Sequence, residues 1–251
     1  MKLSGNTILI TGAGSGIGRA LALHFAKLDN QVIICGRRKN RLEEVAQMNA
    51  NIDYQPCDIS SPEDRNRLYE FCKEKYPQLN VLVNNCAVQT DYDLLAGTPG
   101  LEYAEKEIDI NLTAPILLTG MFLPDIMKQK DPVIVNVTSI LGFMPLTRIP
   151  IYCAAKAGFH VYTLVLRKQL EGTGVKVFDV PPPRVETELN PEGRRKAALA
   201  GTDSAGSLMP EEYAAYVIEH LGNDELDIFY GEGGELVKNV PRPVSEGSRL
   251  N

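Results

Sequence analysis

"ILITGAGSGIGRALALHFA" (residues 8–26) joins an apolar run to an amphipathic one through glycines at positions 12, 14, 16 and 18. The run 7–11 predicts a buried strand, and residues 17–28 predict a helix. A strand that enters a helix through glycines lets backbone N–H groups approach a pyrophosphate, while the helix N-terminus adds partial positive charge. A glycine-rich turn without a ligand is the alternative, but the strand before it and the helix after it favour a phosphate loop. The residues predicted to bind there are Gly12, Ser15, Gly16, Ile17 and Gly18.

The rest of the chain repeats this alternation of short apolar runs and longer amphipathic ones. Further strands are predicted at 31–35, 52–57, 81–84, 133–137 and 175–180, and further helices at 40–48, 62–75, about 102–129 and 152–171. Several strands are apolar almost throughout, which is typical of strands buried on both faces of a parallel sheet. Ser61 and Pro62 mark one helix start, as N-cap and first helical residue. We expect an α/β fold with a helix-covered parallel sheet, in a single domain over 1–251.

The regular pattern ends after residue 180. Residues 181–209 mix prolines, charges and small side chains, and such a segment buries too little surface to offset its ordering entropy alone. It follows the sixth strand, whose carboxyl end faces the ligand crevice in a doubly wound sheet. We therefore expect residues 184–210 to form a mobile substrate lid. A helix at about 210–221 and a short strand near 226–230 are expected to follow.

The composition argues against several kinds of partner. The chain has 251 residues, 44% of them hydrophobic, so it can bury a sizeable core, and its net charge of −6 gives no reason to expect nucleic acid. No apolar run reaches the roughly 18 residues of a membrane span. The N-terminus lacks the apolar core and cleavage site of a signal peptide, so we expect a cytoplasmic protein. Five scattered cysteines and three isolated histidines argue against a disulfide framework and against a metal site.

The end of the second predicted strand indicates which dinucleotide binds. NAD sites usually place an Asp or Glu there, about 20 residues after the glycines, to accept hydrogen bonds from the ribose hydroxyls. This chain has Gly36 followed by Arg37 and Arg38. The missing carboxylate removes repulsion against a 2′-phosphate, and a guanidinium can hold that phosphate with two hydrogen bonds. The arginines could instead belong to a solvated basic turn, but the pattern favours NADP over NAD.

A tyrosine and a lysine lie four residues apart in "IYCAAKAG" (151–158). Four residues are about one helical turn, so Tyr152 and Lys156 are expected on the same helix face. Such pairs are common by chance, and the pair alone indicates only ordinary helix residues. The motifs that precede it change this interpretation.

In order, "TGAGSGIG" (11–18), "NNCA" (84–87), Asn111, Ser139 and "YCAAK" (152–156) resemble the motifs of the single-domain short-chain dehydrogenases/reductases. The resemblance spans about residues 5–190. It implies a Rossmann-like doubly wound parallel sheet with strand order 3-2-1-4-5-6-7, bound NAD(P), and a homodimer or homotetramer formed through the helices around 102–129 and 152–171. Three segments further resemble the bacterial DltE-type oxidoreductases, namely "NQVIICGRR", "LNVLVNN" and "PIYCAAKAG".

The resemblance implies catalytic roles for four residues. Tyr152 would give a proton to the alkoxide that develops when a ketone is reduced. Lys156 would lower the pKa of Tyr152 from its usual ~10 and would hold the nicotinamide ribose. Ser139 would donate a hydrogen bond to the substrate oxygen, and Asn111 would anchor a water that links Lys156 to solvent. Taken singly, Ser139 could simply end a strand, and Asn111 could be a helix-bending residue beside Pro115.

The resemblance also implies coenzyme contacts outside the glycine loop. Asp58, in "CDI" (57–59), would bind the adenine amino group, although capping the turn before helix 62–75 is an equal alternative. The other coenzyme contacts implied are Ile59, Asn85, Tyr152, Lys156, Val185 and Thr187.

The sequence departs from the family pattern in two places. "NNCA" replaces the usual N-N-A-G, but Cys86 and Ala87 are small enough to keep the backbone close to the coenzyme. In "VPPPRVETEL" (180–189), Pro182-Pro183 stands where Pro-Gly is usual. A fixed φ and a lost N–H therefore replace the freedom of glycine next to the nicotinamide amide.

Together these features predict an NADP(H)-dependent oxidoreductase that interconverts a carbonyl compound and an alcohol. The alternative is a non-catalytic NADP(H)-binding regulatory or redox-sensing protein, which has no use for an aligned proton relay. The pocket walls are expected from 88–97, 140–150 and 184–210, where apolar side chains predominate and Arg148 is a candidate anion contact. We therefore expect a small-molecule substrate, mostly apolar or mid-sized, and no metal.

Overall fold

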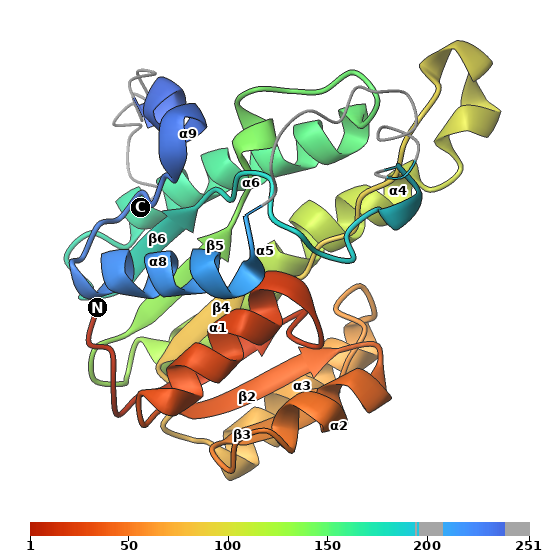
Figure 1. The fold of residues 1–251 in the computed structure, drawn as a ribbon. Coiled ribbons are helices and arrows are strands. Elements are labelled where there is room, and N and C mark those ends of the chain that lie inside the picture. Colours follow the sequence, from red (N-terminus) through yellow and green to blue (C-terminus); the bar gives the residue numbers. More distant parts are fainter. Residues whose placement is uncertain (194, 196–207, 239–251) are drawn as a thin grey trace, which may run out of the picture.

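Six parallel strands form the centre of the protein in the computed structural model, which describes residues 1–193, 195 and 208–238 (Figure 1). The strands are β1 Thr7–Thr11, β2 Gln31–Gly36, β3 Ile52–Pro56, β4 Val81–Asn84, β5 Val133–Val137 and β6 Lys176–Val180. The first six of the seven predicted strands are confirmed, with ends that differ from the prediction by no more than one residue. The apolar runs identified them because both faces of the sheet are covered.

The strand order is β3-β2-β1-β4-β5-β6, and every neighbouring pair is parallel. The chain moves outward from β1 to β3, then returns to pair β4 with the other side of β1. The loops that leave β1 and β4 therefore diverge at the carboxyl edge of the sheet. This is the place where a doubly wound sheet binds its ligands.

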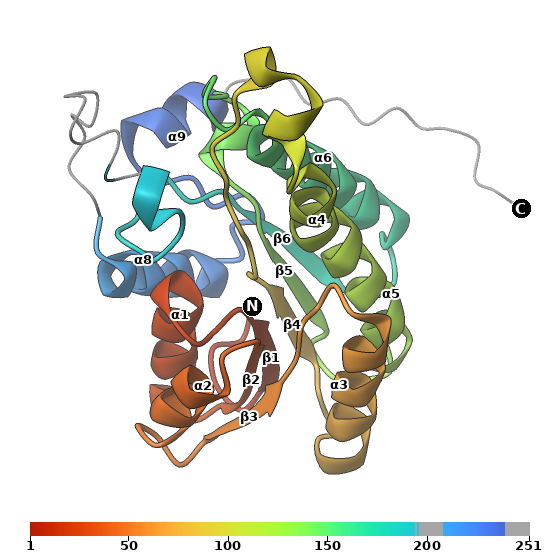
Figure 2. The ribbon, with the colours of Figure 1, turned by 90° about the vertical axis from the view of Figure 1, so that its right-hand side faces the viewer.

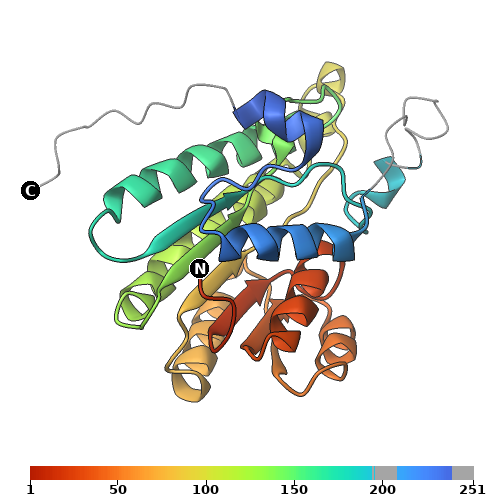
Figure 3. The ribbon, with the colours of Figure 1, turned by 60° about the vertical axis from the view of Figure 1, so that its left-hand side comes forward.

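Helices cover both faces of the sheet, and Figure 2 shows the two layers. One layer holds α1 Gly16–Lys27, α2 Lys39–Ala46 and α8 Pro210–Gly222, and the other holds α3 Pro62–Lys75, α4 Ala104–Ile108, α5 Ala114–Ile126 and α6 Pro150–Gln169. A hydrophobic core lies on each face of the sheet, and alternate strand residues point into one core or the other. Ile8 and Ile10 pack toward the first layer, and Leu9 packs toward the second. Figure 3 shows α8 running beside α1, with α9 Gly231–Lys238 near the carboxyl edge.

The helix starts agree with the sequence only in part. Ser61 caps α3, because its Oγ accepts a hydrogen bond from the backbone N–H of Asp64 (3.2 Å). The helix α6 begins at Pro150, two residues before the predicted start. Short 3-10 turns at Leu94–Ala96, Thr98–Leu101 and Ile140–Gly142 lie in the loops that follow β4 and β5.

The helix predicted at about 102–129 is confirmed as a continuous helical stretch over 104–126, but it is not a regular α-helix throughout. Residues Asp109–Thr113 form a π-helical turn between α4 and α5, in which the N–H of Ala114 bonds to the carbonyl of Asp109. One reason is Pro115, which has no N–H for the carbonyl of Asn111 four residues earlier. Turns of this kind inside helices are frequent at functional sites.

The short strand predicted near 226–230 is wrong. Asp227 forms one parallel bridge with Asp179 of β6, flanked by hydrogen bonds from Asp179 N to Leu226 O (2.8 Å) and from Ile228 N to Asp179 O (2.9 Å). The chain then leaves the sheet, because Gly231 has a φ of 68° and starts α9. The seventh position of the implied strand order is therefore held by a one-residue bridge.

The predicted lid at 184–210 lies largely outside the described residues. Its first part, 184–193, is described, and Val185 forms a bridge with Leu208. The three prolines before it are anchored, since the carbonyl of Pro182 accepts a hydrogen bond from Ile140 N (3.1 Å). The motion of the lid stays a prediction. Among the residues that the structure describes, no helix is long and apolar enough to cross a membrane.

Candidate active site

The glycine loop between β1 and α1 packs against the chain that leaves β4. Gly12 has a φ of 68°, and a Cβ built on it would lie 2.7 Å from the Cα of Cys86. A Cβ on Gly18 would overlap Nδ2 of Asn85. A larger residue at either position would push the two chains apart. The glycines therefore let the loop pack closely on the chain after β4, and without side chains they leave its backbone N–H groups accessible to phosphates.

Asn85 holds this loop in place. Its Nδ2 donates to the carbonyls of Thr11 (2.9 Å) and Gly12 (3.3 Å). The hydroxyl of Thr11 in turn accepts from the backbone N–H groups of Asn85 (2.9 Å) and Cys86 (3.0 Å). The sequence suggested a coenzyme contact for Asn85, whereas its side chain joins the ends of β1 and β4.

The N-terminus of α1 has the features of an anion site. Ser15 is the N-cap residue, its side chain makes no capping hydrogen bond, and the first turn of α1 contains no acidic residue. The first N–H groups of a helix have no intrahelical acceptor, and the helix dipole adds positive charge. With the low glycine loop before it, this end of α1 fits a pyrophosphate.

A cationic cluster lies beside Ser15. The Nη2 of Arg38 donates to Ser15 Oγ (2.8 Å), and its Nη1 pairs with Glu188 Oε2 (2.6 Å). The Nη2 of Arg41 lies 3.5 Å from the other oxygen, Oε1, of Glu188. The sequence indicated Arg37 and Arg38 but missed Arg41, because position 41 reads as an ordinary residue of α2 that also pairs with Glu44 three residues later.

Cys86 lies in the loop after β4, against Gly12 of the glycine loop. Burial raises the pKa of its thiol to about 11, and the positive charges of Arg37 and Lys156 oppose that rise. Cys86 therefore interacts electrostatically with both the arginine after β2 and the lysine of α6. With that raised pKa the thiol stays protonated and weakly reactive.

Lys156 is buried at the carboxyl end of β5. Its Nζ donates to the carbonyl of Val137 (2.8 Å), and only 2% of the residue is exposed. Burial lowers the pKa of Lys156 to about 8, while the nearby Cys86 and Asp179 act in the opposite direction. This amine can therefore change charge near neutral pH.

Tyr152 lies one turn before Lys156 on α6, as predicted. Its ring centroid is 5.9 Å from the Nζ of Lys156, and 5% of the residue is exposed. Tyr152 belongs to a buried apolar cluster with Ile149 and Cys153. One residue from each loop that leaves the last three strands packs against this cluster, namely Ala87, Leu141 and Leu189.

Ser139 and Asn111 are both buried. The Oγ of Ser139 accepts from Leu141 N (3.1 Å) at the end of β5. The side-chain amide of Asn111 pairs with both backbone groups of Val88, accepting from its N–H (2.9 Å) and donating to its carbonyl (2.8 Å). Asn111 therefore fixes the loop after β4, and its part in a water chain stays a prediction.

The remaining predicted coenzyme residues have local contacts. The Oδ1 of Asp58 accepts from the hydroxyl (2.7 Å) and N–H (3.1 Å) of Ser60, the turn-capping arrangement weighed as its alternative role. Ile59 and Val185 pack their side chains into the two cores, which leaves only their backbones for a ligand. Thr187 lies against the glycine loop, since a Cβ on Gly16 would be 2.9 Å from its Cγ2. The adenine and nicotinamide contacts of these residues stay predictions.

A buried acid–imidazole pair beside Lys156 was missed by the sequence analysis. Asp179 of β6 is fully buried, and its Oδ1 accepts from the hydroxyl of Thr138 (2.5 Å). Its Oδ2 contacts Nδ1 of His160, which lies one turn after Lys156 on α6. The available signal was an aspartate in the otherwise apolar end of "VKVFDV" (175–180).

The walls of the expected substrate pocket are joined by Asp91. Its Oδ1 pairs with Nη1 of Arg148 (2.7 Å) and accepts from Nδ2 of Asn190 (2.8 Å). These residues come from the three segments predicted to line the pocket. Arg148, proposed from sequence as an anion contact, thus has a carboxylate partner.

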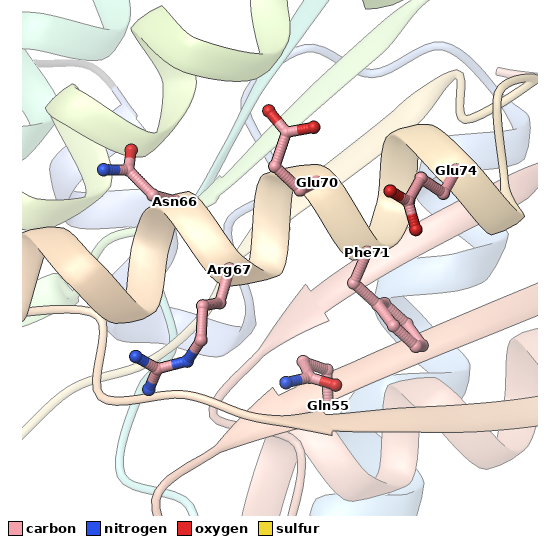
Figure 4. Close-up of a pocket in the computed structure, with 6 residues that line it drawn as sticks. All are labelled: Gln55, Asn66, Arg67, Glu70, Phe71 and Glu74. Atoms are coloured by element: carbon pink, nitrogen blue, oxygen red, sulfur yellow. The ribbon is translucent and has the colours of Figure 1, made fainter.

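Two hollows differ in their relation to this site. One of about 450 Å³ lies between α3 and β3, lined by Gln55, Asn66, Arg67, Glu70, Phe71 and Glu74 (Figure 4). It contains none of the candidate site residues. The other, of about 430 Å³, is lined by Leu141, Leu146 and Cys153 among others, and so borders the turn of α6 that carries Tyr152. Of these two, the second belongs to the site region.

Comparisons with known proteins agree with this geometry. The profile of the family described as short chain dehydrogenase matches residues 6–198. The chain is 42% identical over 228 residues to the protein named "Uncharacterized oxidoreductase DltE" of Bacillus subtilis (strain 168), covering 91% of this chain and 89% of that one. It is 32% identical over 195 residues to an uncharacterised oxidoreductase of Staphylococcus saprophyticus, covering 76% of this chain and 82% of that one.

Solved structures give the same result. A short-chain dehydrogenase from Sphingobium yanoikuyae, in complex with NADPH, is 26% identical with a TM-score of 0.76, over 89% of this chain and 87% of that one. A short-chain dehydrogenase/reductase from Burkholderia phymatum, in complex with NAD, is 21% identical with a TM-score of 0.81, over 98% and 99%. The second likeness shows the fold alone. The glycine loop, the order of the motifs and these matches establish that the chain belongs to the short-chain dehydrogenase family, as an oxidoreductase of the DltE type.

Proposed function

We propose that this oxidoreductase uses NADP(H) to interconvert a carbonyl compound and an alcohol, with Tyr152 as general acid and base. The observation that carries the proposal is the burial of Tyr152 in an apolar cluster to which the loops after β4, β5 and β6 contribute, one turn from the buried amine of Lys156. This cluster lies at the carboxyl edge of the sheet, where the glycine loop also lies. A tyrosine in that position is within reach of a substrate held against the coenzyme.

The cationic cluster supports NADP as the coenzyme. Ser15, Arg38 and Arg41 gather at the start of α1, and no carboxylate stands at position 36 to accept ribose hydroxyls. A guanidinium pairs well with a phosphate dianion, so the three side chains suit a 2′-phosphate. Two related structures, at 26% and 25% identity, were solved with NADPH and with NADP+.

The chemistry assigned to each residue follows from its position. When bound, the nicotinamide supplies or accepts the hydride. In reduction Tyr152 gives its phenolic proton to the substrate oxygen, and in oxidation it takes that proton back. The ammonium of Lys156 favours the phenolate form, and Ser139 donates a hydrogen bond to the substrate oxygen. Asn111 anchors a water through its carbonyl, for which Pro115 supplies no helical N–H.

The substrate is proposed to be a mid-sized, mostly apolar carbonyl compound. Ala87, Leu141 and Leu189 are the side chains from the pocket loops that pack against the cluster of Tyr152. They exclude water, which strengthens the electrostatic interactions inside the site. Asp91 already neutralises Arg148, so an anionic substrate gains little there.

A homo-oligomer is proposed as the working form in the cytoplasm. Leu117 of α5 and Val161 and Val165 of α6 are exposed by 47%, 57% and 39%. The two helices lie side by side in the same layer (Figure 2). Exposed apolar side chains on adjacent helices are the composition expected of an interface between subunits.

Changing Tyr152 to Phe removes the hydroxyl and keeps the ring in its cluster. Turnover on an accepted ketone should fall by about 100- to 10,000-fold, while the melting temperature and NADPH binding stay close to wild type. The control is Tyr103→Phe at an exposed tyrosine, which should leave turnover unchanged. NADPH consumption over a panel of ketones and aldehydes is the measurement. A Tyr152→Phe enzyme with near-normal turnover would refute the assigned mechanism, and a wild type that binds NADPH but reduces nothing would favour the regulatory alternative.

The affinity for NADPH should depend on pH through Lys156. The ammonium form, which holds the ribose, is complete below the pKa of about 8 and is lost as the pH rises through it. The dissociation constant should therefore increase above about pH 8 in the wild type. Lys156→Ala should bind NADPH about tenfold to a hundredfold more weakly at pH 7, as expected for a lost charge-assisted hydrogen bond, and without this alkaline step. Titrations across the neutral and alkaline range test this, with Lys168→Ala as control. The same alkaline step in the Lys156→Ala variant would contradict it.

Arg38→Ala should weaken NADPH binding by about one to two decades, because a charge-assisted pair with the 2′-phosphate is lost. NADH binding should change little. Arg67→Ala, on the exposed surface of α3, is the matched control. Calorimetric titration of both coenzymes measures the two constants for each protein. If unmutated protein binds NADH as tightly as NADPH, the preference proposed here does not exist.

Val161→Asp should shift the protein toward monomers, because it places a charge in the middle of the proposed interface. Met48→Asp, at an exposed methionine beyond α2, should not. Sedimentation velocity at micromolar concentration distinguishes the species. A wild type that sediments as a monomer at all accessible concentrations would exclude the oligomer.

A further inference from the structure

Glu188 is an acidic residue inside the cationic cluster. Its Oε2 pairs with Nη1 of Arg38 (2.6 Å), and its Oε1 lies 3.5 Å from Nη2 of Arg41. The hydrogen bond from Arg38 is the main cause that holds the pKa of Glu188 below its usual range, with the charge of Arg41 acting in the same direction. The carboxylate therefore remains ionised, and it forms ion pairs with both Arg38 and Arg41.

The position of Glu188 is fixed by its neighbours in the chain. Thr187 lies against Gly16 of the glycine loop, and Leu189 packs in the cluster around Tyr152. The next residue, Asn190, is bonded to Asp91. These three contacts, at residues 187, 189 and 190, place the segment between the glycine loop and the tyrosine cluster. The backbone on either side of Glu188 is therefore held in place.

Arg38 has two nitrogens that face the cluster, and both are engaged. Nη2 donates to Ser15, and Nη1 donates to Glu188. A phosphate and a carboxylate are both anionic acceptors that suit the same fork of N–H groups. Under the proposed function, a 2′-phosphate must reach this guanidinium, so Glu188 occupies the place that the phosphate needs.

Resting on the proposed function, we propose that Glu188 determines coenzyme specificity by competing with the 2′-phosphate for Arg38 and Arg41. An NADP(H) molecule has to displace the carboxylate and then tolerate its negative charge nearby. An NAD(H) molecule has no phosphate to place, so the pair of Glu188 with Arg38 persists beside its ribose. NAD sites usually provide a carboxylate in that region from the end of the second strand, where this chain has Gly36. Glu188 therefore narrows the preference for NADPH over NADH.

The test compares Glu188→Gln with wild type and with Glu192→Gln, an exposed glutamate four residues later in the same segment. The probes are NADPH and NADH, together with 2′,5′-ADP and 5′-AMP, which differ only in the phosphate on the 2′-oxygen. In Glu188→Gln the dissociation constants of NADPH and 2′,5′-ADP should fall by roughly two- to fivefold, the range for an exposed ion pair. NADH and 5′-AMP should bind with unchanged or weaker affinity. Glu192→Gln should match wild type for all four.

The double variant Glu188→Gln with Arg38→Ala separates competition from a general effect of charge. If Glu188 acts through Arg38, its removal should improve NADPH binding much less once Arg38 is absent. A wild type that prefers NADPH, together with a Glu188→Gln variant whose ratio of NADPH to NADH affinity is unchanged or lower, would overturn this inference and leave the proposed function intact. A wild type that binds neither dinucleotide would overturn both.

Discussion

The arrangement of the site depends on the burial of one ammonium group, that of Lys156. Its hydrogen bond to the carbonyl of Val137 joins α6 to the end of β5. Burying a charge is costly unless it is paired and hydrogen-bonded, and the lowered pKa of Lys156 reflects that cost. Tyr152 lies one turn earlier on the same helix, in the apolar cluster against which the loops leaving β4, β5 and β6 pack. A shift of α6 along its axis would break the lysine contact and disturb that cluster.

The buried network around Asp179 acts on the same region. Thr138 and His160 occupy the two oxygens of this carboxylate, which connects β6 to the end of β5 and to the next turn of α6. Its negative charge opposes the lowering of the Lys156 pKa. Breaking a buried pair by removing one partner is strongly destabilising, whereas exposed pairs contribute little. The geometry at Lys156 is therefore held mainly by buried polar contacts, and the exposed ion pairs around Arg38 contribute little to the stability of the fold.

The fold was largely predictable from sequence because a buried parallel strand must be apolar on both faces. Residues 133–137 were readily predicted as a strand because four of the five are Val or Ile. The glycine loop identified the strand before it and the helix after it. The prediction failed where pattern and geometry separate. "LDIFY" (226–230) is apolar enough for a strand, but Gly231 turns the chain after a single bridge. The π-helical turn at Asn111 is likewise a matter of hydrogen-bond geometry that hydrophobic periodicity does not record.

The site was predictable to the extent that its residues follow motifs. Tyr152 and Lys156 lie on one helix turn, and Ser139 follows its strand directly, so local spacing places them. The spacing of 150 residues between Arg38 and Glu188 carries no local signal. The same holds for Asp91, which meets Arg148 and Asn190 from separate loops. Such contacts follow from the sheet topology, which brings the loops after β2, β4, β5 and β6 to one edge.

The segment 187–190 connects the glycine loop and the arginines to the tyrosine cluster. Thr187 and Glu188 contact the glycine loop and the arginines, while Leu189 and Asn190 contact the tyrosine cluster and Asp91. These four residues form bends, with a φ of 51° at Asn190, so they span less than the roughly 10 Å of a fully extended chain of that length. The contacts of the arginines and those of the tyrosine cluster are therefore carried by one short piece of backbone. The sheet topology sets this arrangement, because it brings the chain after β6 past the loops that leave β1, β2 and β4.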